Sequence, residues 1–163
     1  MTDNPYSDKL VKLLCWLFPA TLLVHITEEY WGGLAFSSSP SSMRGVNLTP
    51  TNFLLLTGLA WALMVTGIFL ARKFNFPELF LVLLGTIVLI NGLSHTISSV
   101  VGAEYNPGLI SGVLVWIPLG GVTLALMKRR MGSRRYWFGV MAGAAIHGVV
   151  SLLALGGGSV RGV

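Results

Sequence analysis

Five long apolar runs constrain the fold of this sequence more than any other feature. They cover approximately residues 10–31, 53–71, 79–101, 109–127 and 136–155, and a transmembrane α-helix needs about 20 mostly apolar residues. Charged residues make up only 10% of the chain, against roughly 25% in an ordinary soluble domain. So few charges cannot cover a surface that faces water. The sequence therefore predicts an all-α integral membrane bundle of five transmembrane helices, forming a single domain over residues 1–163.

The basic residues predict how this bundle is oriented. With five spans, the N-terminus and the second and fourth loops share one side, and the opposite side carries only Arg44 and Arg161. Cytoplasmic loops carry an excess of Lys and Arg, so we expect a cytoplasmic N-terminus and an external C-terminus in the plasma membrane of a bacterium or archaeon. Because the basic clusters lie between apolar runs, the net charge of +5 indicates membrane topology and no nucleic-acid partner. The basic residues on the expected cytoplasmic side are Lys9, Lys12, Arg72, Lys73, Lys128, Arg129, Arg130, Arg134 and Arg135.

Ionisable residues inside the apolar runs are the main indication of function. Each costs about 2.5–3.5 kcal/mol at the centre of a bilayer and is functional by default. All three histidines and two of the six acidic residues fall within the predicted spans. The first span carries His25, Glu28 and Glu29, which lie three and four residues apart and therefore share one face of a helix.

The third and fifth spans carry the remaining intramembrane histidines. Asn91 and His95 are four residues apart and share a face, and His147 lies among small residues that favour close helix packing. At 1.5 Å rise per residue, the three histidines lie in a slab about 8 Å thick. The first, third and fifth helices run in the same direction, so these side chains are expected to meet in or near the outer half of the membrane.

Three imidazoles and two carboxylates are the ligand types of zinc, non-haem iron and manganese sites. We therefore predict a divalent metal as cofactor, bound inside the bundle as one ion or as two. Asn91 suits either a helix–helix hydrogen bond or a place at the metal. One of Glu28 and Glu29 is expected to be a ligand and the other a catalytic proton shuttle. The candidate metal-site residues are His25, Glu28, Glu29, Asn91, His95 and His147.

The run His25-Ile26-Thr27-Glu28-Glu29, followed by Asn91-x-x-x-His95 and by His147, resembles the HXXEE-domain family. The resemblance covers roughly residues 13–155. It implies a small multi-helix membrane protein and a metal-dependent enzyme, and it supplies no substrate. The prediction of a metal site follows from spacing and depth without it.

Three functions are compatible with this ligand set. The first is an enzyme that acts on a hydrophobic small molecule or lipid, and hydrolysis is favoured because it needs only a metal and a proton acceptor. The second is a metal-ion carrier or channel, which requires access from both faces of the membrane. The third is a structural polar network without metal, although Ser, Thr and Asn would pair helices at a lower desolvation cost.

Overall fold

A computed structural model of the protein describes residues 5–34 and 49–156, with side chains described for 9–32 and 49–153. The first helix, α1, continues without a break into a π-helical turn, η1. The fourth helical run consists of three consecutive segments, α4, η3 and α5. The elements are α1 (Pro5–Glu29), η1 (Tyr30–Leu34), α2 (Pro50–Lys73), α3 (Pro77–Gly102), α4 (Leu109–Ser111), η3 (Gly112–Trp116), α5 (Ile117–Lys128) and α6 (Ser133–Gly156).

The structure confirms five helices that are long and apolar enough to cross a membrane, and the described residues contain no strand. These spans cover 9–32, 50–73, 77–102, 109–128 and 133–153. Their ends lie within three residues of the predicted runs, and most extend beyond them because a helix continues past its apolar part. Pro50 and Pro77 occupy the first helical turns of α2 and α3, where a proline is well tolerated.

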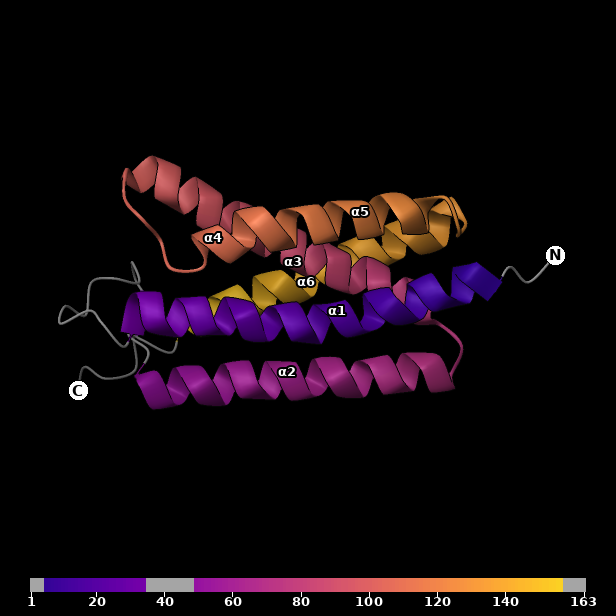
Figure 1. Ribbon diagram of the computed structural model, residues 1–163, viewed down its shortest axis with the longest axis horizontal. Helices are drawn as coiled ribbons and strands as arrows, with labels where there is room; N and C mark the ends of the chain where they lie inside the picture. Colours follow the sequence, from indigo (N-terminus) through magenta and orange to yellow (C-terminus); the bar gives the residue numbers. More distant parts are fainter. Residues whose placement is uncertain (1–4, 35–48, 157–163) are drawn as a thin grey trace.

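The orientation of the bundle in the membrane stays a prediction. The start of α1 and the end of α6 lie at opposite ends of the bundle (Figure 1), as five consecutive spans require. Arg44 and Arg161, the two basic residues assigned to the outer side, lie outside the described residues.

Helix α3 is the central element of the bundle, and it packs against α1, α2, α5 and α6 (Figure 1). Glycines allow the closest of these contacts. A Cβ added to Gly92 would lie 2.9 Å from the carbonyl oxygen of Gly112, and one added to Gly143 would lie 2.7 Å from that of Leu83. These approaches bring the α4–η3 and α6 backbones onto α3, and they fix the position of the helix that carries Asn91 and His95.

Helix α2 is the most peripheral span. Only 11% of its apolar window is buried, compared with 39% for α3. It contacts α1 and α3, and the Trp61 indole N–H donates a hydrogen bond of 3.1 Å to the carbonyl oxygen of Pro19. Its exposed leucines are those expected of a helix that faces lipid.

The fourth span changes its helical geometry before Pro118. The amide of Ile117 donates to the carbonyl oxygen of Gly112, five residues earlier, so η3 is a π-helical turn. Proline lacks an amide hydrogen and disturbs the preceding turn of a helix, which explains the position of this irregularity. Because η3 ends at Trp116, the irregular turn holds the indole that packs on His25.

Candidate metal centre

Helix α1 presents His25 and Glu29 on one face near the end where it passes into η1. The two residues are one helical turn apart, and Nε2 of His25 lies 3.4 Å from Oε1 of Glu29. The His25 side chain is 1% exposed and that of Glu29 is 16% exposed. A buried imidazole and a largely buried carboxylate at this spacing confirm the predicted convergence of His25 with Glu29 on one helix face.

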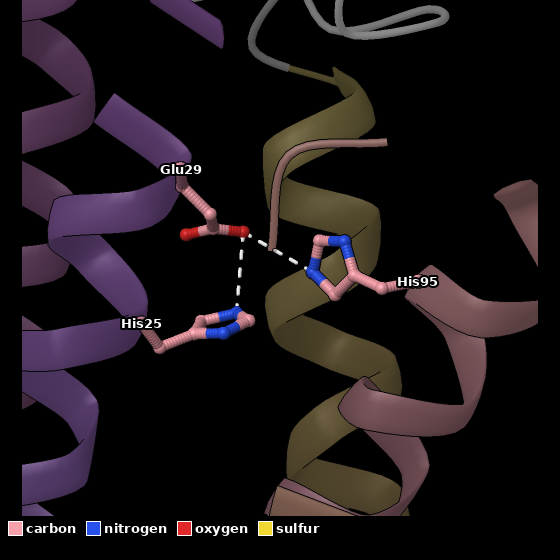
Figure 2. A group of neighbouring side chains, drawn as sticks. All are labelled: His25, Glu29 and His95. Carbon is pink, nitrogen blue, oxygen red and sulfur yellow. Dashed lines mark ion pairs between the residues drawn. The ribbon is translucent and has the colours of Figure 1, made fainter. Parts of the chain in front are cut away.

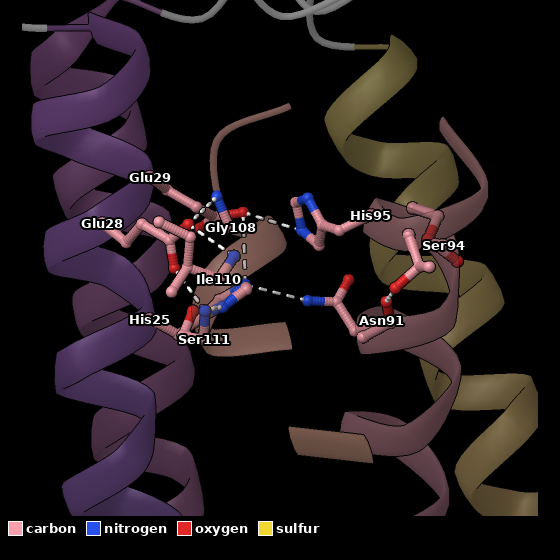
Figure 3. Close-up of polar contacts among 12 residues, drawn as sticks. His25, Glu28, Glu29, Asn91, Ser94, His95, Gly108, Ile110 and Ser111 are labelled. Atoms are coloured by element: carbon pink, nitrogen blue, oxygen red, sulfur yellow. Dashed lines mark hydrogen bonds and ion pairs between the residues drawn. The ribbon is translucent and has the colours of Figure 1, made fainter. Parts of the chain in front are cut away.

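Helix α3 brings His95 to the same point from the opposite side (Figure 2), and it also carries Asn91 toward His25 (Figure 3). Nε2 of His95 lies 3.2 Å from Oε1 of Glu29, and Nδ2 of Asn91 lies 3.1 Å from Nε2 of His25. The imidazoles of His25 and His95 meet edge to face with ring centroids 5.0 Å apart. Four polar side chains from two separate spans therefore share one centre.

Three of these residues can hold a metal ion. One ligand atom from each of His25, Glu29 and His95 lies within 4.8 Å of the others, and this is the one such group of His, Cys, Asp or Glu among the side chains described, 9–32 and 49–153. Ligands about 2.1 Å from a tetrahedral ion are about 3.4 Å apart. The separations of 3.4 and 3.2 Å from Glu29 Oε1 to the two Nε2 atoms are compatible with that spacing, and the third pair of atoms lies within 4.8 Å.

The fourth span holds the His25 ring from two directions. The indole of Trp116 stacks on it at a centroid distance of 3.6 Å and an interplanar angle of 25°. The hydroxyl oxygen of Ser111 lies 2.7 Å from Nδ1 of His25. Both neighbours are buried, so the ring has a defined plane and its Nε2 is directed toward Glu29 and Asn91.

Glu28 is directed away from this group, toward the start of α4 (Figure 3). Its Oε1 accepts hydrogen bonds from the Tyr105 hydroxyl (2.8 Å) and from the amides of Gly108 (3.2 Å) and Ile110 (2.8 Å). Its Oε2 accepts from the amide of Ser111 at 2.7 Å. The unpaired amides of a helix N-terminus favour a negative charge, and here Glu28 supplies that charge from another helix.

Tyr105 lies in the connection between α3 and α4, outside the spans. Burial, followed by its hydrogen bond to Glu28 and the charge of that carboxylate, raises the pKa of Tyr105 to about 12. The hydroxyl therefore stays protonated and remains a donor to Glu28 at neutral pH.

Gly108 closes the site from the same connection. It has φ +93°, and a Cβ added there would lie 2.7 Å from Cε1 of His95 and 2.8 Å from Cε1 of His25. Only glycine has both the required backbone freedom and the absence of a side chain at this point. Beneath it, Nδ1 of His95 is buried without a hydrogen-bond partner among the described residues.

His147 does not join the group of three ligands. It is partly buried on α6, and its Nε2 lies 3.4 Å from the hydroxyl of Ser151 on the same helix. Its distance along the helix predicts the same depth as that of the other histidines, but depth does not determine which way a side chain points. A metal-binding role for His147, as for Glu28, remains a prediction.

Sequence reasoning missed the residues that surround the ligands: Ser111, Trp116, Tyr105 and Gly108. The turn Asn106-Pro107-Gly108 was recognisable, since Pro and Gly mark turns. Its position over the histidines was not recognisable, because that depends on how the fourth span docks on α1.

Comparison with known proteins gives a family and no close relative of established activity. A family model described as a protein of unknown function with an HXXEE motif matches residues 16–123. The match includes the two ligand-bearing segments of α1 and α3 and the first part of the fourth span, and it ends before His147. Neither the curated proteins nor the solved structures contain a match to this chain.

Proposed function

The chain belongs to the family of proteins with an HXXEE motif, and we propose that it is an integral membrane enzyme that uses one divalent metal ion bound by His25, Glu29 and His95. The main support for this proposal is that one ligand atom from each of the three residues lies within 4.8 Å of the others. Ionisable groups are costly inside a membrane, and a divalent ion that accepts two lone pairs and one negative charge offsets that cost.

A single ion is favoured over two. The oxygens of Glu28 already accept four hydrogen bonds from the loop and α4. His147 lies outside the ligand group. The remaining set of two imidazoles and one carboxylate is that of catalytic zinc sites and of non-haem iron sites, both of which keep coordination positions open.

Glu29 is then the carboxylate ligand, whereas Glu28 accepts hydrogen bonds from backbone amides. When bound, such an ion polarises an oxygen of the substrate or activates water. The amide nitrogen of Asn91 lies 3.1 Å from Nε2 of His25, where it can donate a hydrogen bond to a bound substrate. Hydrolysis needs no electron donor, and this supports a hydrolase over an oxidase.

The substrate is proposed to be a lipid or another hydrophobic small molecule. The ligands project from transmembrane helices, and the described residues form no separate domain that could bind a polar substrate. Buried apolar residues, including Phe18, Leu22 and Val88, fill the bundle on the other side of His25. An ion passing through the protein would have to cross this apolar layer, so the arrangement supports an enzyme over a carrier or channel.

One observation favours a second candidate, a polar network without metal. Glu29 already pairs with both imidazoles, and Asn91 already contacts His25. These contacts join α1 to α3, and a network of this kind stabilises helix pairs in membranes.

Elemental analysis of the full-length protein in detergent separates the two candidates. After supply of zinc, iron and manganese in turn, we expect about one tightly held ion per chain, as a three-ligand site requires. His95→Ala should lose the ion, and His147→Ala is the matched control that should keep it. Folded protein that retains none of the three metals would refute the enzyme and leave the polar network. Hydrolysis of an apolar ester in micelles, absent from His95→Ala, would then test the reaction.

A further inference from the structure

The segment 103–108 connects the third and fourth spans, and we propose that it is a lid that closes the ligand group off from the water phase, with Glu28 as its latch. The segment lies outside both spans, yet Pro107 and Gly108 within it are buried. The lid is a property of the protein alone, whereas its control over the uptake of an ion rests on the proposed function.

Gly108 places the backbone of the lid directly on the two imidazoles, between the helices that carry them (Figure 3). A Cβ at Gly108 would lie 2.7 Å from Cε1 of His95 and 2.8 Å from Cε1 of His25. These distances are well below an ordinary van der Waals contact of about 3.5–4.0 Å, so neither a methyl group nor a water molecule fits between the lid and the rings. Water or an ion that approaches from this end of the bundle reaches the ligand group only when the lid moves.

Glu28 holds the lid in place from α1. Its Oε1 accepts hydrogen bonds from the Tyr105 hydroxyl at 2.8 Å and from the Gly108 amide at 3.2 Å, so one oxygen binds both the middle and the end of the lid. From the other side, the Ser99 hydroxyl of α3 accepts a hydrogen bond of 3.0 Å from the amide of Asn106. Glu28 is not one of the three ligands, so its contacts with the lid can break while the ligand group stays intact.

The two ends of the lid have the backbone geometry of hinges. Ala103 ends α3 with φ 50°, and Gly108 precedes α4 with φ 93°. A left-handed backbone is disfavoured for alanine, so the closed position of the lid depends on the contacts that hold it. Lids commonly turn on a few residues at the ends of regular elements, and loss of the hydrogen bonds to Glu28 would free the lid between these two residues.

Labelling of a cysteine beneath the lid tests its motion without metal. His95→Cys is made in a Cys15→Ala background, and its rate of reaction with a charged methanethiosulfonate reagent is measured in detergent. Glu28→Gln replaces an accepting oxygen by an NH₂ group and should raise this rate about 10–100-fold, the effect on an opening equilibrium of losing a hydrogen bond to a charged group. Tyr105→Phe should raise it less.

The native cysteine is the control for global unfolding. Cys15 is 1% exposed in the apolar core, and in a chain that keeps His95 its labelling rate should be the same with and without Glu28→Gln. Equal labelling at position 95 with and without Glu28→Gln, or a parallel rise at Cys15, would overturn the proposal. If Glu28→Gln fails to fold, the comparison with Tyr105→Phe decides.

A disulfide tests whether the lid controls the ion. A Cβ at Gly32 would lie 3.5 Å from that of Pro107, within the roughly 3.5–4.5 Å that separate the Cβ atoms of a disulfide. Gly32→Cys/Pro107→Cys, with Cys15→Ala, therefore joins the lid to the end of the first span. The control pair is Gly85→Cys/Thr123→Cys in the same background, whose Cβ atoms would be 3.4 Å apart at the contact of α3 with α5.

We expect the locked protein to take up no zinc. When zinc is added before oxidation with diamide, the locked protein should retain it against a chelator until the disulfide is reduced, which shows that the ligand group is intact. The oxidised control pair should take up and release zinc like wild type. Zinc uptake or release by fully locked protein would overturn the role of the lid, and if the disulfide does not form, the labelling rates decide. A wild type that binds no zinc would refute the proposed function, and the labelling rates would still test the lid and its latch.

Discussion

Glu28 and Glu29 are neighbours in the sequence, but their carboxylates belong to two different polar regions. Oε1 of Glu29 lies between two imidazoles, at 3.4 and 3.2 Å from their Nε2 atoms. The oxygens of Glu28 accept hydrogen bonds from a tyrosine hydroxyl and three backbone amides. One carboxylate faces α3 and the other faces the start of α4 (Figure 3).

Helix geometry explains this division. Consecutive residues on an α-helix are rotated by about 100°, so two adjacent carboxylates reach two different neighbouring helices. Backbone amides cannot bind a metal ion, and imidazoles can. The two acidic residues of the motif therefore separate into one that docks the fourth span and one that can bind an ion, with His25 in contact with both regions.

The largest expected effect is that of Glu29→Gln on metal binding. The substitution removes the only charged ligand of the group while keeping the size of the side chain. Zinc affinity should fall by more than about 100-fold, exceeding the loss expected for a residue that only contacts a ligand. Titration of zinc into the detergent-solubilised protein measures it. Equal affinity in the variant and the wild type would show that Glu29 is not a ligand.

Glu28→Gln should instead act on stability. A glutamine places an NH₂ group against donors that need an acceptor, and hydrogen bonds to charged groups contribute about 1.5–3 kcal/mol. We expect the free energy of unfolding to fall by about 2–3 kcal/mol, with about one zinc ion still bound at saturation because His25, Glu29 and His95 remain. Denaturant unfolding and elemental analysis measure the two quantities. Loss of the ion with unchanged stability would assign Glu28 to the metal.

Gly108→Ala tests the contact between the two regions. A left-handed backbone costs a non-glycine residue about 1–2 kcal/mol, and the added Cβ would meet both imidazoles at 2.7–2.8 Å. We expect stability to fall by about 1–2 kcal/mol and zinc affinity to fall as well, since the rings must move. Thermal unfolding and zinc titration check this.

The matched control is Gly148→Ala, because a Cβ at Gly148 has no neighbour within 4 Å. Alanine in a helix is favoured over glycine by about 0.5–1 kcal/mol, so this variant should be at least as stable as wild type. A Gly108→Ala protein that is as stable as the control and binds zinc equally well would show that Gly108 does not pack against the two imidazoles.

The sequence was sufficient to predict the five spans and the pairing of residues within a helix. Long apolar runs have one stable arrangement in lipid, and residues four apart share a helix face, so His25 with Glu29 and Asn91 with His95 followed directly. The ends of the spans were less certain, because apolarity ends before hydrogen bonding does, as at Arg72 and Lys73 in α2.

The different roles of Glu28 and Glu29 could not be predicted in this way. Glu28 and Glu29 both share a face with His25 by spacing, and the partner of each depends on the rotation of α1 relative to α3 and α4. Ser111 and Trp116 carried no pattern in the sequence, since a serine and a tryptophan in an apolar run are ordinary packing residues. Their roles arise because the fourth span packs closely on α3, where Gly112 meets Gly92.

Tyr105 provides the smallest and most specific test of the Glu28 region. Its pKa is raised from 10.0 to about 12 by burial and by the adjacent carboxylate, so the protonated form is favoured in the folded protein. The resulting stability is fully present below pH 10 and is lost as the pH rises toward 12. Because the side chain is 48% exposed, its hydrogen bond should contribute no more than about 1 kcal/mol. The melting temperatures of wild type and Tyr105→Phe, compared from neutral pH to pH 12, should therefore converge. A difference that stays constant across this range would mean that Tyr105 does not donate to Glu28, and the docking of the fourth span would then depend on the backbone amides alone.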